Sequence, residues 1–257
     1  MNSAARLITA LRRSQDHLAA VVAGLDAASL RCPSYSADWS IAQVLSHLGS
    51  QAEIFGLLLD AGLCGGDPPA QDAFPPIWDA WNARSPEDQA ADSVSANEGF
   101  VRRLEALDAP ELDALHLSAF GMELDAAGFL RLRLPELAVH SWDIDVVLDP
   151  SATIAHDAVE LLIDGVPALA ALVGKPTKRP TTLRVTTNEP ERSFALVTDG
   201  VRLEPWSERT HDGVLEVSSE ELLRLVYGRL DSAHAASVRL DSPKLTLDEL
   251  RAVFPGV

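Results

Sequence analysis

The sequence predicts an α+β fold in which a four-helix bundle is followed by a small α+β domain. Apolar residues recur at helical spacing through the first part of the chain, whereas short runs of strand type occur only in the last part. The pattern changes at Asp149-Pro150. We therefore expect a helical bundle over residues 1–150 and an α+β domain over residues 151–257.

In the first domain, apolar residues at helical spacing predict a helix from about Ala4 to Leu25. Asp38 or Ser40 is expected to cap a second helix, which runs from Ile41 through Phe55. The stretch Gly62–Pro69 is rich in glycine and proline, and it predicts a loop.

A third helical region begins near Ile77 and is expected to restart at Ser85-Pro86, because serine is a good cap and proline suits the first helical turn. A fourth helix is predicted over roughly Asp125 to Val147. It contains Pro135, which removes a backbone donor and should kink the helix. Helices joined by loops of these lengths favour an antiparallel bundle, whose core commonly holds metal ligands.

The second domain should begin with a helix from about His156 to Val173. Ser219 is expected to cap a further helix, and a last helix is predicted from Leu247 to Phe254. Short apolar runs between these helices predict strands at Thr181–Thr186, Phe194–Thr198, Val201–Pro205, Val214–Val217 and Val238–Leu240.

Composition limits the classes of function. The 257-residue chain is 47% hydrophobic and 23% charged, as is usual for a globular protein. Its formal net charge of −17 would repel nucleic acid and anionic membranes, so we expect neither as a partner. Without an apolar run long enough to span a membrane or a signal-type pattern, the chain is predicted to be cytoplasmic. The two cysteines form no close-spaced metal motif.

Glu136 and His140 are the first candidates for metal ligands. They are four residues apart on the fourth helix, so both side chains leave the same helical face. Their neighbours are mostly apolar, and a buried polar pair needs a partner. Asp143 follows His140 by three residues and could hold its second ring proton, the usual support for a ligating histidine. The alternative is an ordinary helix face with a paired carboxylate and a partly buried histidine.

His47, on the second helix, is a further candidate. Two imidazoles and one carboxylate would leave a coordination position open, which is typical of metal ions that do chemistry. The alternative is a histidine at the edge of an amphipathic helix, hydrogen-bonded to a neighbour. Spacing along the chain does not decide between these readings, because the ligands of a bundle come from separate helices.

Two runs of sequence resemble those of a known family. The run 39–48 (WSIAQVLSHL) resembles the second-helix signature of the mycothiol-dependent maleylpyruvate isomerase family, which belongs to the DinB-like metal-binding bundles. The run 136–143 (ELAVHSWD) resembles its later metal-binding helix, and the C-terminal half is similar to its small sterol-carrier-like α+β domain. The resemblance implies that His47, Glu136 and His140 ligate a divalent metal, with zinc expected.

The resemblance also implies mycothiol as a cosubstrate. A thiol at the open position would lose its proton and attack a small electrophilic substrate. Addition to an activated double bond, rotation and elimination would make the protein a cis–trans isomerase, whereas retention of the adduct would make it an S-transferase. Two alternatives are a non-catalytic protein that binds a metal and a small molecule, and a metal-dependent hydrolase.

Because the family uses an arginine from its second domain, Arg229 in the run YGRL is the candidate to hold a substrate carboxylate by bidentate contact. In that case the site would lie between the domains. The alternative role for Arg229 is to end a helix and meet its carbonyl dipole. The protein is expected to be a monomer or a homodimer, and the sequence does not identify the electrophile.

Overall fold

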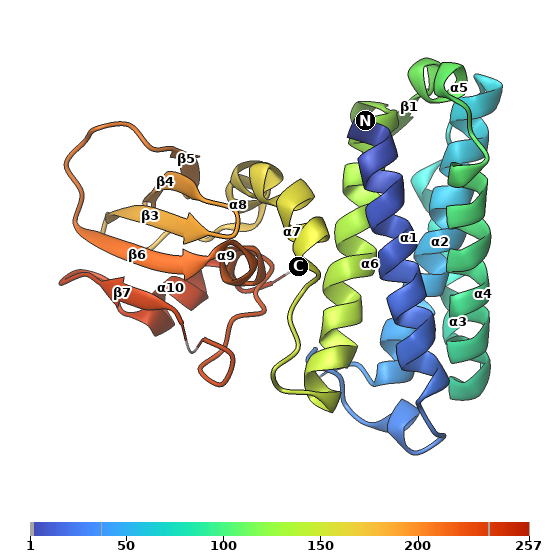
Figure 1. The fold of residues 1–257 in the computed structure, drawn as a ribbon, viewed down its shortest axis with the longest axis horizontal. Coiled ribbons are helices and arrows are strands. Elements are labelled where there is room, and N and C mark those ends of the chain that lie inside the picture. The colour runs from blue at the N-terminus through green and yellow to red at the C-terminus, as the bar shows by residue number, and fades with distance from the viewer. Residues whose placement is uncertain (1–2, 37, 236, 257) are drawn as a thin grey trace. The chain divides into compact units, whose positions relative to one another are not determined.

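The structure, a computed structural model, describes residues 3–36, 38–235 and 237–256. The chain divides into two compact units, Met1–Ala152 and Thr153–Val257. The first unit is helical with one short hairpin, and the second contains a five-stranded sheet with helices (Figure 1). The predicted α+β fold, with its helical part first, is confirmed. Within the described ranges, no helix is long and apolar enough to cross a membrane.

Long helices build the first unit (Figure 1): α1 Ser3–Ala23, α2 Ile41–Cys64, α4 Pro86–Glu105 and α6 Ala126–Leu148. Helices α1 and α2 each pack against both α4 and α6. The apolar stripe of α1 faces this core, where Leu7, Leu11 and Leu18 are almost completely buried. The apolar residues whose spacing predicts the helix are thus the residues that it buries in the bundle core.

Local chemistry sets where these helices begin. The Ser40 side chain accepts a hydrogen bond from the backbone N–H of Gln43, and the Gln43 side chain accepts one from the backbone N–H of Ser40. Of the two expected caps, Ser40 is thus the one that caps α2. Ser85 caps α4 with Pro86 in the first turn, as predicted.

The predicted loop Gly62–Pro69 is partly wrong, because α2 continues through Gly62 to Cys64 and ends at Gly65 in the left-handed conformation. Gly62 lies inside the helix for a packing reason. A Cβ at this position would lie 2.8 Å from Leu115 Cδ1, so glycine permits the next segment to pack closely on α2.

Shorter elements complete the first unit, and the sequence pattern indicates neither strand of its hairpin. They are η1 Ser29–Arg31, η2 Gln71–Ala73, α3 Phe74–Asn82, α5 Ala109–Ala114, β1 His116–Ala119 and β2 Met122–Asp125. Strands β1 and β2 pair antiparallel through a turn in which Phe120 (φ 53°) and Gly121 (φ 76°) are both left-handed. A bulky residue rarely adopts this conformation, so the turn lacks its usual sequence signal.

A five-stranded sheet in the order β5-β4-β3-β6-β7 forms the centre of the second unit. Its strands are β3 Thr182–Asn188, β4 Arg192–Val197, β5 Arg202–Pro205, β6 Gly213–Ser218 and β7 Arg239–Asp241. Strands β3 and β6 are parallel, and the other pairs are antiparallel. The helical elements of this unit are α7 His156–Leu162, η3 Ile163–Gly165, α8 Val166–Val173, α9 Ser219–Val226 and α10 Leu247–Val253.

Two expectations for the second unit need correction. The single helix expected over 156–173 is divided into α7, η3 and α8, because Pro167 cannot donate to a preceding carbonyl and instead occupies the first turn of α8. The cap of α9 is Ser218, which forms a capping box with Glu221, and not Ser219. The Ser219 hydroxyl instead donates to the carbonyl oxygen of Pro190.

Candidate metal centre

The structure brings His47 on α2 together with Glu136 and His140 on α6. His47 Nε2 lies 2.9 Å from Glu136 Oε2, and His140 Nε2 lies 3.8 Å from the same oxygen. One ligand atom from each of the three residues lies within 4.8 Å of the others. Packing of α2 against α6 thus joins the i, i+4 pair to a residue 89 positions earlier in the chain.

Asp143 supports this group from the far side of the His140 ring. Its carboxylate Oδ2 lies 2.9 Å from His140 Nδ1, and the residue is completely buried. A carboxylate at this distance keeps the ring proton on Nδ1, so that the lone pair of Nε2 is directed toward Glu136 and His47.

Helix α6 contains a proline directly before Glu136. Pro135 lies inside α6, is buried, and has no N–H to donate to the carbonyl of Arg131. The kink expected at this point stays a prediction. The side chains of Glu136 and His140 keep partial access to solvent, which a small ion or ligand requires.

The charges of the group suit a cation. Burial would raise the pKa of Glu136, but the hydrogen bond with His47 and the electrostatic effects of His140, His47 and Arg133 together lower it to about 2. Burial lowers the pKa of His47 despite the opposing effect of Glu136. At neutral pH the group therefore offers an ionised carboxylate and a neutral His47 imidazole, the protonation states that metal ligands need.

Arg133, for which the sequence pattern gives no expectation, is a buried cation one helical turn before Glu136. It is completely buried, and its Nη2 donates to Asn97 Oδ1. Its guanidinium carbon lies 5.6 Å from the ring centre of Phe55 and 5.9 Å from that of Phe100. Burial lowers its pKa to about 10, so it stays protonated at neutral pH. The signal in the sequence is an arginine between the leucines at 132 and 134.

A cavity of about 450 Å³ opens beside His47. Trp39 lies in its wall with its ring centre 5.3 Å from that of His47, and Trp78 and Asn82 come from α3. The remaining lining residues are Gln43, Ser50 and Gln51 of α2. Among the described lining residues, the side chains other than His47 are two indoles and several amide and hydroxyl groups, which can hydrogen-bond a polar ligand.

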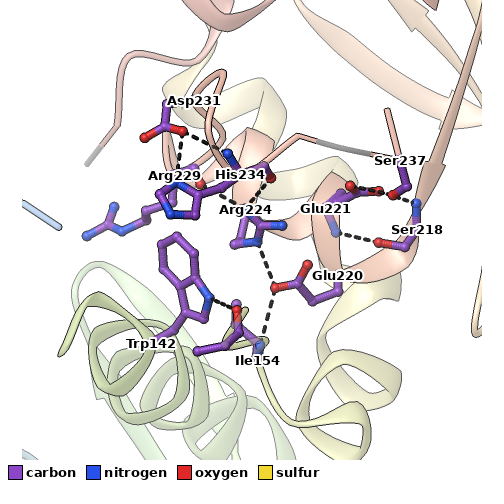
Figure 2. Close-up of polar contacts among 11 residues, drawn as sticks. Trp142, Ile154, Ser218, Glu220, Glu221, Arg224, Arg229, Asp231, His234 and Ser237 are labelled. Carbon is purple, nitrogen blue, oxygen red and sulfur yellow. Dashed lines mark hydrogen bonds and ion pairs between the residues drawn. The ribbon is translucent and has the colours of Figure 1, made fainter. Parts of the chain in front are cut away.

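Arg229 belongs to the second unit, in the segment after α9, and Figure 2 shows its surroundings. It is buried, and its Nη1 donates to the carbonyl oxygen of Tyr227, the C-terminal cap of α9. Arg224 donates in turn to the carbonyl oxygens of Arg229 and His234. The contact with Tyr227 is of the kind expected for an arginine that ends a helix. Carboxylate binding by Arg229 stays a prediction.

Comparison with known proteins points to one family. The family model described as the mycothiol maleylpyruvate isomerase N-terminal domain matches residues 11–145, a range that contains His47, Glu136 and His140. Over the whole chain, the structure is similar to the crystal structure of a mycothiol-dependent maleylpyruvate isomerase, with a TM-score of 0.70, 15% identity, and coverage of 96% of this chain and 95% of that one.

The crystal structure of a histidine-to-alanine mutant of a mycothiol-dependent maleylpyruvate isomerase is also similar, with a TM-score of 0.70, 14% identity and the same coverage of both chains. At these identities the likeness shows a shared fold. No curated protein matches the chain significantly.

Proposed function

Because this chain belongs to the family of the mycothiol maleylpyruvate isomerase N-terminal domain, we propose that it is a mycothiol-dependent enzyme that acts on a small electrophile. Isomerisation is the reaction that the family favours, and S-transfer is the variant that uses the same first step. The observation that carries the proposal is the convergence of His47, Glu136 and His140 beside a cavity.

We propose that these three residues hold a divalent metal, with zinc expected. Their two nitrogens and one oxygen are donor types that zinc commonly takes, and three protein ligands leave a position open. A bound divalent cation would supply the positive charge that stabilises a thiolate at neutral pH. Asp143 would hold the His140 ring in place, and Glu136 would remain ionised.

The proposed reaction requires no oxidant or reductant. The thiolate adds to one carbon of an activated double bond, and the electron pair of that bond moves to the activating carbonyl. Rotation about the new single bond and expulsion of the thiolate then give the other geometric isomer. In an S-transferase the adduct would instead be protonated and released. Trp39 and Trp78 would enclose the reactants, while Gln43, Gln51 and Asn82 would hydrogen-bond their polar groups.

The cavity lining favours thiol chemistry over hydrolysis. A hydrolase needs an acid or base to move protons between water, substrate and leaving group. Among the described residues that line the cavity, His47 is the one titratable side chain, and it is already assigned to the metal. A thiol cosubstrate is itself the nucleophile, so its reaction requires fewer acid or base side chains in the cavity wall. A non-catalytic binding protein remains the second candidate, because a metal and a cavity alone would serve it.

The deciding experiment combines zinc-loaded protein, mycothiol and a panel of electrophiles that begins with maleylpyruvate, followed by mass spectrometry. Isomers of unchanged mass indicate an isomerase, and adducts of added mass indicate a transferase. We expect His47→Ala to abolish turnover, whereas His116→Ala, a change at an exposed histidine of the same unit, should retain it. Product formation without mycothiol would reject the proposal. Bound zinc without any turnover would favour the binding protein.

Arg229 is proposed to bind the carboxylate of such a substrate. Arg229→Lys keeps the charge but loses the two-pronged contact, so KM for a carboxylate substrate should rise while zinc content stays unchanged. If KM equals that of the unmodified protein, Arg229 does not bind the substrate carboxylate, and its role is the contact with the carbonyl oxygen of Tyr227.

A further inference from the structure

A second cavity, of about 290 Å³, collects the lysines of this chain. Lys175, Lys178 and Lys244 are the only lysines in the sequence, and all three line this cavity together with Arg179. The protein as a whole carries a formal net charge of −17. In so acidic a chain, an even distribution of charged residues would not place all the lysines at one cavity.

The fold of the second unit brings these residues together. Lys175, Lys178 and Arg179 lie between α8 and β3, whereas Lys244 lies between β7 and α10. The backbone N–H of Lys175 donates to the carbonyl oxygen of Val253 at 2.8 Å, which ties the first segment to the end of α10. Thr177 is joined to Thr198 by a backbone hydrogen bond of 2.9 Å and a hydroxyl contact of 2.7 Å. The wall of the cavity is therefore held in place before any ligand binds.

The cations are only partly neutralised. Lys244 Nζ lies 2.6 Å from Asp212 Oδ1, and Arg179 Nη2 lies 3.3 Å from Glu249 Oε1. Glu249 is also a lining residue, and it completes the capping box at the start of α10. Within the described part of the chain, Lys175 and Lys178 have no carboxylate at ion-pair distance. Two ammonium groups thus line the cavity without a fixed counter-charge.

The rest of the lining is largely apolar and is contributed by Pro176, Leu245, Ala252 and Val253. A pocket with two unpaired cations and an apolar wall suits a small dianion with an apolar part. Long polyanions and anionic membranes fit it poorly, because they would also meet the negative field of the remaining molecule.

We propose that this cavity, which we call the lysine pocket, binds a small organic dianion, either a phosphate monoester or a dicarboxylate. The described residues that line it all belong to the second unit, and none of them lines the cavity beside His47. The proposal does not depend on the metal or on thiol chemistry.

The test is calorimetric titration of the full chain with three probes: phenyl phosphate, benzylmalonate and uncharged benzyl alcohol. We expect one or both dianions to bind in the micromolar to millimolar range, more weakly as salt is added, and benzyl alcohol not to bind. Binding of phenyl phosphate alone identifies a phosphate-ester site, and binding of benzylmalonate alone identifies a dicarboxylate site.

Variants locate the binding. The double variant Lys175→Gln with Lys178→Gln should bind the dianion at least about tenfold more weakly. The corresponding double change to arginine should keep the affinity within about threefold of that of the unmodified protein. Arg102→Gln with Arg131→Gln removes the same charge from exposed positions of the first unit and should have little effect. Circular dichroism verifies folding of each variant. Absence of binding by both dianions, or equal weakening in the Arg102 and Arg131 control, would overturn the proposal.

Discussion

At the scale of single residues, the contact between Asp143 and His140 should determine how tightly the proposed site holds its metal. Asp143→Asn retains the shape of the side chain but removes the charge that orients the imidazole and raises its basicity. We expect the affinity for Zn²⁺ to fall by roughly 10- to 100-fold, measured by competition with a chelator.

A matched control for this change is Asp145→Asn. Asp145 lies two residues further along α6 and pairs with His17, away from the ligands. The control should leave the affinity for Zn²⁺ unchanged. Equal affinities for the Asp143→Asn variant and the unmodified protein would mean that His140 is oriented by other contacts.

A second residue prediction concerns the buried charge of Arg133. Asn97 Oδ1 accepts from Arg133, while Asn97 Nδ2 donates to the carbonyl oxygens of Ser93 and Leu48. Asn97→Ala would remove this acceptor from a completely buried cation, so we expect the free energy of unfolding to fall by about 3 kcal/mol.

Urea unfolding measures the loss, with Ser95→Ala at an exposed position of the same helix as the control. Arg133→Met should cost less than Asn97→Ala, because it removes the charge together with its requirement for a partner. If Arg133→Met is the more damaging change, the guanidinium stabilises the bundle by itself.

At the scale of helices, a histidine joins α1 to α6. His17 Nε2 lies 2.6 Å from Asp145 Oδ2, and this hydrogen bond raises the pKa of His17 above its ordinary value of 6.5. A raised folded pKa stabilises the fold fully below pH 6.5, and the contribution is lost as the pH rises through the folded pKa. His17→Gln should therefore reduce stability at pH 5.5 and have little effect near pH 9.

The expected difference is below about 1 kcal/mol, because the His17 side chain is more than half exposed and water screens the pair. Urea unfolding of both proteins across this pH range measures it. A difference that does not change with pH would mean that the imidazole acts by packing and not by charge.

The starts of α2 and α4 could be predicted from the sequence, because they depend on adjacent residues. Ser40 and Ser85 sit beside partners three positions away, so the chain itself displays the capping chemistry. The turn at Phe120 is different. The exposed Phe120 has ring contacts with Phe55 and Phe74, whose ring centres each lie 6.2 Å from its own and whose positions are distant in the sequence. Contacts between distant residues leave no local pattern.

The same distinction holds for the candidate sites. Glu136, His140 and Asp143 lie on one helix, so their spacing could suggest a metal ligand pair and its support. His47 comes from α2, and only resemblance to a family linked it to them. The lysine pocket joins Lys175 to Lys244 through the folding of the sheet domain, and three scattered lysines carry no motif that would indicate it.

At the scale of the whole molecule, the proposed metal site and the lysine pocket are formed by residues of different units. The proposed metal ligands all lie in Met1–Ala152, and the lysine pocket lies in Thr153–Val257. A ligand that binds only the folded form stabilises the cooperative unit that contains its site. Each ligand should therefore report on one unit, which allows the two proposals to be tested independently in the intact chain.

Hydrogen exchange of the full chain with and without Zn²⁺ provides this test. At zinc concentrations about 100-fold above Kd, stabilisation of about 2.7 kcal/mol should slow the slowest amides of α2 and α6 roughly a hundredfold. The amides of strands β3 to β6 should be unaffected, because no proposed ligand lies in them. His47→Ala should abolish the protection, whereas His116→Ala should retain it. Equal slowing in both units would mean that they unfold as a single cooperative body, and slowing confined to the sheet would place the zinc site outside the bundle.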